Sequence, residues 1–425
     1  MHFRDIQRVP GDPILGLIEA YANDANPHKF DLGVGVYKDS QGQTPVPRAV
    51  KAAEQRLVDR QMTKTYIGSH GEPRFGTLIS ELVLGIDSPL IEAKRAGATQ
   101  TPGGTGALRL AADFIAQCLP GKGIWLSDPT WPLHETIFGK AGLKVGHYPY
   151  VGSDNRLNVD GMLDALRQVP QGDVVLLHAC CHNPTGFDLS HDDWRAVLEI
   201  VQSRKLLPLI DFAYQGFGDG LEDDAWAVRL FAETLPELLI TSSCSKNFGL
   251  YRERTGALIV CTDDAQKLLD VRSQLASIAR NLWSNPPDHG AAVVAEILDD
   301  PELKSLWADE VEEMRQRVAQ LRSGLVDALT PLGLAERFAH IAQQRGMFSY
   351  TGITREQVTR LREEQSVYMV NDGRANMAGI DASRLDQLAQ AIAAVCKGIR
   401  GNAGCVLASD TPVSDSKHLP PFIAP

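Results

Sequence analysis

Short apolar runs alternate with longer amphipathic segments along residues 100–262. Positions 174–177 and 206–210 hold only apolar residues, a composition typical of strands that are covered on both faces. Helical patterns, for example over 192–201 and 224–234, lie between such runs. We therefore expect an α/β domain with a mainly parallel sheet, whose strands lie at 123–127, 145–150, 173–178, 206–210, 238–242 and 256–260.

Helical periodicity becomes dominant after residue 263. The pattern predicts helices over 263–280, 301–329 and 354–363, and short strands at 346–350 and 367–370. Asp381 is a suitable N-cap for a last helix. These elements indicate a second, smaller α+β domain.

The composition excludes several classes of protein. The 425 residues predict two or three domains, and the 44% apolar and 22% charged residues are ordinary for a soluble globular enzyme. The net charge of −11, with both signs interleaved, argues against a nucleic-acid surface, and no apolar run is long enough for a membrane span. The first residues lack the apolar core of a secretory signal. Seven scattered cysteines predict free thiols in a reducing cytoplasm, and no Cys/His set has the spacing of a zinc site.

Residues 242–256, SSCSKNFGLYRERTG, carry the most informative chemistry. Lys246 lies among hydroxyl residues, and a lysine amine can form a Schiff base with an aldehyde when its surroundings lower its pKa. Arg254 and the serines can bind a phosphate, and Asp211, at the end of an apolar run, can hold a protonated ring nitrogen. These are the groups that pyridoxal 5′-phosphate requires. Taken alone, a lysine near serines would be a solvated surface residue.

A glycine-rich segment at 103–106 opens the helical pattern of 107–117. Glycines let a backbone approach a ligand closely, and a helix N-terminus offers free N–H groups to an anion. Such a loop is more often a plain turn, so the signal is weak by itself. Beside Ser243, Ser245 and Arg254 it predicts a phosphate cup.

Six motifs together resemble class I pyridoxal-phosphate aminotransferases, specifically the aspartate and aromatic amino-acid enzymes. They are LGVGVYK at 32–38, TPGGTGALR at 101–109, CCHNPTG at 180–186, DFAYQGF at 211–217, the lysine motif at 242–256 and SNPP at 284–287. The resemblance covers residues 4–398. It implies the PLP-dependent transferase fold type I, with a mainly parallel seven-stranded sheet in a large domain and a smaller α+β domain. The implied divisions are an N-terminal arm (1–12), a small domain (13–45 and 311–398), a large PLP-binding domain (46–310) and a disordered tail (399–425).

The resemblance also implies how the cofactor is bound. Lys246 would carry the cofactor, and Asp211, oriented by His134, would pair with the ring nitrogen. Alone, Asp211 could equally be a loop residue or helix cap, and His134 a surface or core histidine. The remaining contacts implied are the Gly104 and Thr105 backbone, Ser243, Ser245, Arg254 and the neighbouring subunit's Tyr66 for the phosphate, Asn183 and Tyr214 for the phenolic oxygen, and Trp131 for the ring face. Asp128–Pro129 and Asn183–Pro184 are expected to be cis.

Two arginines would select the substrate in such an enzyme. By resemblance, Arg374 binds the α-carboxylate, with Gly35, Trp131 and Asn183 completing the pocket. Arg280 would cross from the neighbouring subunit of a homodimer to the distal carboxylate of aspartate, glutamate or 2-oxoglutarate. Without the family, Arg280 would be taken for a solvated helix residue.

The implied reaction is a ping-pong transfer of the amino group from tyrosine, phenylalanine and aspartate to 2-oxoglutarate, with Lys246 moving the proton. A strict aspartate aminotransferase remains open, because Val36, Lys38, Thr44, Thr105 and Asn285 look aspartate-type. Segment 344–352 looks closer to the aromatic enzymes but is expected away from the side-chain pocket, and Trp283 could form a pocket wall or pack in the core. The rivals are a PLP lyase or decarboxylase, disfavoured by Arg280, and a non-catalytic binding protein, disfavoured by the intact site residues.

Overall fold

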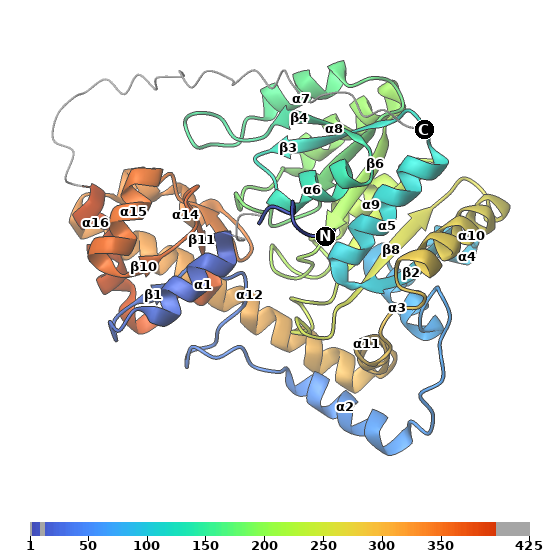
Figure 1. Ribbon diagram of the computed structural model, residues 1–425, viewed down its shortest axis with the longest axis horizontal. Helices are drawn as coiled ribbons and strands as arrows, with labels where there is room; N and C mark the ends of the chain where they lie inside the picture. Colours follow the sequence, from blue (N-terminus) through green and yellow to red (C-terminus); the bar gives the residue numbers. More distant parts are fainter. Residues whose placement is uncertain (1, 9–12, 397–425) are drawn as a thin grey trace.

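The computed structural model describes residues 2–8 and 13–396, and its centre is a mixed sheet (Figure 1). The strand order is β2-β8-β7-β6-β5-β3-β4, and β8 runs antiparallel to both of its neighbours while the other six point the same way. The strands are β2 (Ala96–Pro102), β3 (Gly123–Asp128), β4 (Lys144–Pro149), β5 (Val174–His178), β6 (Leu207–Phe212), β7 (Leu238–Ser243) and β8 (Thr255–Cys261). The mainly parallel seven-stranded sheet is therefore confirmed.

Within the seven-stranded sheet, β2 is the strand that the apolar pattern did not predict. Its centre consists of Thr99, Gln100 and Thr101, which are fully buried although they are polar. Hydrogen bonds compensate for this burial: the Gln100 side chain donates to the carbonyl of Pro287 (2.7 Å) and accepts from the N–H of Glu72 (2.9 Å). A strand whose buried positions are polar and paired leaves no hydrophobic signal in the sequence.

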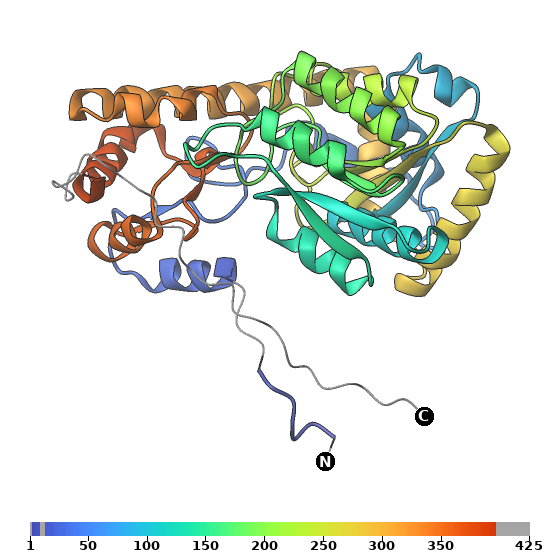
Figure 2. The same ribbon diagram turned by 90° about the horizontal axis from the view of Figure 1, so that it is seen from above.

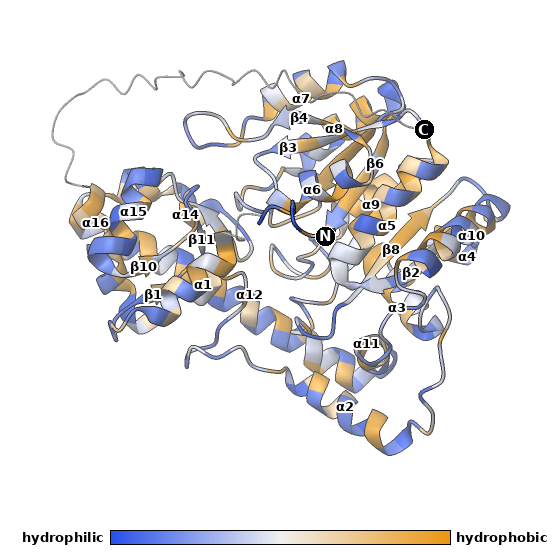
Figure 3. Cartoon of the chain, in the orientation of Figure 1, coloured by the Kyte–Doolittle hydropathy of each residue, from blue (hydrophilic) through white to orange (hydrophobic). Residues whose placement is uncertain are grey.

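The alternation of side chains along the strands explains why both faces of the sheet are covered. In β5, Val174 and Leu176 belong to one apolar cluster, and Val175 and Leu177 belong to another. The first cluster includes α5 (Gly103–Cys118) and α10 (Ala265–Leu282), and the second includes α3 (Pro73–Leu84), α7 (Val159–Gln168), α8 (His191–Arg204), α9 (Trp226–Thr234) and α11 (His289–Asp299). The hydropathy colouring shows a strongly apolar β8 and a mixture of apolar and polar residues on the helices around it (Figure 3). Other helices of this part are α2 (Arg48–Arg60), α4 (Pro89–Glu92) and α6 (Pro132–Lys140).

The long helix α12 (Pro301–Leu329) runs along one side of the molecule, from the sheet to a smaller group of elements (Figure 2). In that group β1 (Phe30–Asp31) pairs with β10 (Val367–Tyr368), and β9 (Phe348–Tyr350) pairs with β11 (Arg374–Asn376). Its helices are α1 (Pro13–Asn23), α13 (Ala335–Phe338), α14 (His340–Gln343), α15 (Arg355–Gln365) and α16 (Leu385–Cys396). Asp381 caps a short 3-10 turn, Ala382–Arg384, that leads into α16.

The domain boundaries stay predictions, and the one at 310/311 falls inside α12. Residues 9–12 of the expected arm and the whole expected tail, 399–425, lie outside the described residues. Within residues 2–8 and 13–396, none of the helices combines the length and the apolar character that a membrane span needs.

Candidate active site

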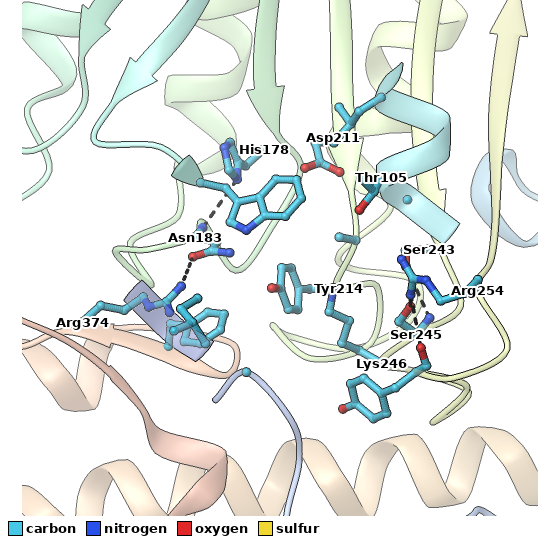
Figure 4. A pocket seen from close by; sticks show the side chains of 18 residues that line it. Thr105, His178, Asn183, Asp211, Tyr214, Ser243, Ser245, Lys246, Arg254 and Arg374 are labelled. Carbon is cyan, nitrogen blue, oxygen red and sulfur yellow. Dashed lines mark hydrogen bonds between the residues drawn. The ribbon is translucent and has the colours of Figure 1, made fainter. Parts of the chain in front are cut away.

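A cavity of about 290 Å³ lies at the end of the sheet where β5, β6 and β7 lead into loops (Figure 4). Twelve of the residues predicted from the sequence line it: Gly35, Gly104, Thr105, Trp131, Asn183, Asp211, Tyr214, Ser243, Ser245, Lys246, Arg254 and Arg374. Parallel strands bring their carboxyl ends to one edge, where residues that are far apart in sequence can meet. The cavity collects these residues from segments between positions 35 and 374.

Lys246 follows β7 and points its amine into this cavity (Figure 4). Its Nζ lies 4.6 Å from the ring centre of Tyr214. Burial lowers the pKa of Lys246 to about 8; the Asp211 carboxylate opposes this shift, and the Arg254 guanidinium adds to it. Because a lowered pKa leaves more of the amine uncharged near neutral pH, Lys246 is suited to act as a nucleophile.

Both oxygens of the Asp211 carboxylate are held by side chains. His134, which is fully buried, has its Nε2 3.2 Å from Oδ2, and the Thr241 hydroxyl donates to Oδ1 at 2.9 Å. Burial alone would raise the pKa of Asp211, but the hydrogen bonds from His134 and Thr241 outweigh it and keep this pKa below its ordinary value. Asp211 therefore stays a carboxylate.

His178, which sequence reasoning did not single out, continues this network. Its Nδ1 accepts from the backbone N–H of Asn183 (3.5 Å), and its Nε2 lies 3.2 Å from the Thr130 hydroxyl. Burial lowers the pKa of His178 to about 3, so the ring is neutral and carries its proton on Nε2. The Thr130 hydroxyl is then free to donate to Nδ1 of His134 (2.8 Å), which leaves His134 Nε2 as the donor to Asp211.

The start of α5 forms one wall of an anion cradle. The N-cap position of this helix is Pro102, whose side chain makes no capping hydrogen bond, so the N–H groups of the first turn remain available to a ligand. A Cβ at Gly103, whose φ is +72°, would lie 2.7 Å from an Arg254 nitrogen. The missing side chain thus lets the guanidinium come close to the helix end. Arg254 donates to the Ser245 hydroxyl (3.5 Å), and the Ser243 hydroxyl accepts from the Ser245 N–H (3.3 Å).

Arg374 forms a second anion site on the other side of the cavity (Figure 4). It is 4% exposed, and within the described residues its guanidinium makes only long hydrogen bonds, to Asn183 Oδ1 and to the carbonyl of Gly33, both at 3.4 Å. Its Nε has no hydrogen-bond partner within the described part of the chain. Since a buried cation with free donors is costly, the fork of Arg374 is prepared for a carboxylate.

Two predicted residues lie away from the cavity of their own chain. Tyr66 is 91% exposed, and Arg280, also exposed, is hydrogen-bonded to Ser284. Trp283 packs against the apolar cluster that includes α5 and α10. Both predicted cis peptide bonds, Asp128–Pro129 and Asn183–Pro184, are confirmed.

Six lining residues were missed by sequence reasoning: Ile14, Leu108, His178, Ala213, Tyr251 and Phe348. His178 ends an apolar strand, and this position is a signal that could have found it. Tyr251 lies within the lysine motif, and its hydroxyl accepts the N–H of Tyr37 (3.1 Å). Pairing of β9 with β11 brings Phe348 of segment 344–352 beside Arg374 and into the cavity lining, while the expectation that this segment lies away from the side-chain pocket stays a prediction. The four apolar residues of this set, Ile14, Leu108, Ala213 and Phe348, carried no chemical signal in the sequence.

A lysine with a lowered pKa, an anion cradle, a carboxylate and an unpaired arginine in one cavity are typical of a pyridoxal-phosphate enzyme. The sequence model of the family described as "Aminotransferase class I and II" matches residues 27–392, and the chain belongs to this family. The protein is therefore a PLP-dependent transaminase.

Two curated relatives and one solved structure illustrate the similarity. The aromatic-amino-acid aminotransferase of Pseudomonas aeruginosa is 71% identical over 395 residues, which cover 93% of this chain and 99% of that protein. The aspartate aminotransferase of Escherichia coli is 47% identical over 394 residues, covering 92% of this chain and 100% of that one. The crystal structure of an aromatic-amino-acid aminotransferase from Burkholderia pseudomallei, covalently bound to pyridoxal phosphate, has a TM-score of 0.91 and 46% identity, covering 93% and 100% of the two chains.

Proposed function

We propose that this enzyme transfers the amino group of tyrosine, phenylalanine and aspartate to 2-oxoglutarate in a ping-pong cycle. The observation that carries the proposal is the position of Lys246 between two separate anion sites, the cradle at Arg254 and the fork of Arg374 (Figure 4). One site suits the phosphate of a cofactor, and the other suits the carboxylate of an amino acid. The 71% identity to an aromatic-amino-acid aminotransferase supports the aromatic substrates, and the 47% identity to an aspartate aminotransferase supports aspartate.

The residues of the cavity fit pyridoxal 5′-phosphate. The uncapped start of α5 and Arg254 match a phosphate, and the negative charge of Asp211 matches a protonated ring nitrogen. The holding residues would be Gly104, Thr105, Ser243, Ser245 and Arg254 at the phosphate, Asp211 at the ring nitrogen, Asn183 and Tyr214 at the phenolic oxygen, and Trp131 at the ring face. When bound, this cofactor withdraws electrons from the Cα of an attached amino acid.

Lys246 is the residue that would move the proton of the substrate Cα. An amine whose pKa is about 8 can both accept and return a proton near neutral pH, as general acid–base catalysis requires. Asp211 would keep its negative charge opposite the ring nitrogen, because His134 and Thr241 hold both of its oxygens as acceptors. Arg374 would fix the α-carboxylate and thereby orient the Cα–H bond toward the lysine.

We further propose a cytoplasmic homodimer in which each subunit completes the site of its neighbour. Tyr66 and Met62, 91% and 92% exposed, place large side chains on the surface of a single chain. Arg280 is also exposed, outside the cavity of its own chain. In the dimer, Tyr66 would reach the phosphate of the neighbouring site and Arg280 the distal carboxylate of a dicarboxylic substrate. The domain division at 45/46 and 310/311 belongs to the same proposal, with the site between the two parts.

A half-reaction tests the function directly. The purified holoenzyme is mixed with phenylalanine or aspartate, without an oxo acid, and the visible absorbance of the cofactor is followed. Conversion at comparable rates, with one equivalent of 2-oxo acid released, is expected. Conversion by aspartate alone would make the enzyme a strict aspartate aminotransferase. Release of carbon dioxide or ammonia in place of the 2-oxo acid would favour a decarboxylase or lyase.

A further inference from the structure

Two thiols of the segment that carries Asn183 meet a carboxylate from another part of the chain. Cys180 and Cys181 directly follow the residue after β5, and Asp224 comes from the turn before α9. One ligand atom of each residue lies within 4.8 Å of the other two, and all three residues are buried. Sequence spacing gave no sign of this cluster, because Asp224 is far from the cysteines along the chain.

The carboxylate of this cluster is rigidly held. Its Oδ2 accepts from the N–H groups of Gly216 (2.8 Å) and Gly218 (3.0 Å), whereas among the described residues its Oδ1 accepts from Asp219 N–H alone (2.7 Å). A carboxylate oxygen has two lone pairs, so Oδ1 of Asp224 keeps one for a further partner.

The backbone that presents the thiols is equally fixed. Cys181 has a φ of +52°, and its N–H donates to Asp188 at 2.7 Å, next to the N–H of His182 at 3.0 Å. A Cβ at Gly346 would lie 2.8 Å from the Cys181 sulfur, so this sulfur packs directly against the backbone of the segment that leads to Phe348.

A second cavity, of about 320 Å³, reaches two of the three cluster residues, Cys180 and Asp224. Cys180 and Asp224 line this cavity together with Asp188, Asp219 and Asp223, and the positive group in it, Arg345, is paired with Asp219 at 2.7 Å. The excess of carboxylates attracts cations to the opening. Two sulfur ligands then favour a soft metal over magnesium or calcium, which prefer oxygen.

We propose that Cys180, Cys181 and Asp224 form a binding site for a thiophilic divalent cation such as Cd²⁺ or Zn²⁺. Binding joins the metal to both sulfurs, and the two thiol protons go to solvent. The side facing the cavity leaves room for a water as a fourth ligand. This site is separate from the catalytic cavity, and the proposal of a metal there does not depend on which amino acids the enzyme uses.

Occupation of the site slows amino transfer. Asn183 follows Cys181 by two residues, Phe348 follows Gly346 by two, and both line the catalytic cavity. A metal that draws the two sulfurs toward Asp224 shifts the segment of Asn183 relative to the segment of Phe348. Arg374 contacts both of these residues, so its surroundings are disturbed.

The test uses reduced, metal-free holoenzyme titrated with CdCl₂ in the absence of amino acids, which would chelate the metal. The readouts are the ultraviolet charge-transfer absorption of cadmium thiolates and the cadmium retained per chain after equilibrium dialysis. We expect one Cd²⁺ per chain, with the absorption of two thiolates. Cys180→Ser and Cys181→Ser should each weaken binding by more than about 100-fold, because even outer partners of a metal site are worth about 10–100-fold. Cys118→Ser, a thiol elsewhere in the fold, is the matched control and should bind as the parent does.

Desalted samples are then assayed for amino transfer. Cadmium should inhibit the parent and Cys118→Ser and leave Cys180→Ser and Cys181→Ser unaffected. Cofactor absorbance and circular dichroism verify that each variant is folded. If Cys181→Ser does not fold, Cys180→Ser and Asp224→Asn replace it. No thiolate absorption in the parent, full absorption in the folded variants, or inhibition that survives Cys180→Ser would overturn the proposal.

Discussion

The guanidinium carbon of Arg374 lies 4.5 Å from the ring centre of Phe348. The same ring packs against Gly35, where a Cβ would lie 2.7 Å from its Cζ. An aromatic face attracts a cation without using its N–H donors. Phe348 therefore holds the guanidinium of Arg374 in place without occupying any of its N–H donors.

Phe348→Leu should weaken the binding of every amino acid substrate. The lost cation–π contact is worth about 0.5–2 kcal/mol, which corresponds to an increase of about 2- to 30-fold in KM. Because Phe348 acts through Arg374, kcat should change much less, and steady-state kinetics with phenylalanine and aspartate separate the two constants. Phe348→Tyr keeps the ring and is the control. An unchanged KM in Phe348→Leu would show that the ring does not position the arginine.

Arg374→Ala and Arg280→Leu should differ in the substrates that they affect. Arg374→Ala removes the proposed partner of the α-carboxylate, so kcat/KM should fall by about 100-fold or more for phenylalanine and aspartate alike. Arg280→Leu removes only the proposed partner of the distal carboxylate and should reduce kcat/KM for aspartate and leave the half-reaction with phenylalanine nearly intact. Equal losses for both substrates in Arg280→Leu would contradict its role in the neighbouring site.

Lys246→Met should make the apoenzyme more stable near pH 7. Burial lowers the pKa of Lys246 from 10.5 to about 8, so the folded state is penalised for the charged amine. The penalty is complete below pH 8, shrinks as the pH rises toward 10.5 and disappears above it, where the amine is neutral in the unfolded state as well.

Thermal unfolding of the two apoproteins between pH 7 and 10.5 measures this effect. The advantage of Lys246→Met should shrink steadily across the range. Substitution of the exposed Lys304 by methionine is the control and should not show this trend. A difference that stays constant with pH would assign the effect to packing.

Arg322→Met should destabilise the fold strongly. Arg322 is 2% exposed and donates to the carbonyls of Arg345 (3.1 Å), Gly346 (2.6 Å) and Phe348. Each buried acceptor left without a donor costs about 1–3 kcal/mol, so the free energy of unfolding should fall by at least about 3 kcal/mol. Urea unfolding of the holoenzyme measures the change. Arg315→Met, which breaks a more exposed ion pair with Glu312, should change stability by less than about 1 kcal/mol. Similar losses in both variants would argue against the carbonyl contacts as the cause.

The sequence by itself determined the elements whose signal is local. Apolar runs such as 174–177 and 206–210 had to be strands covered on both faces, and the long periodic segment 301–329 coincides with α12. Motifs fixed the chemistry in the same way, because Lys246 and Arg254 lie within one short segment and Asp211 ends a predicted strand. These signals depend on residues that are neighbours along the chain.

Only the tertiary structure decided which distant residues act together. Strand β2 was hidden because its buried positions are polar and are paired by hydrogen bonds from other segments. The sequence also did not indicate the link from His178 through Thr130 to His134, or the contact of Phe348 with Arg374. The meeting of Asp224 with two adjacent cysteines followed no spacing rule at all. Such contacts form because the packing of strands and turns brings their segments together, and hydrophobic periodicity records which face of an element is buried but not which side chain it meets there.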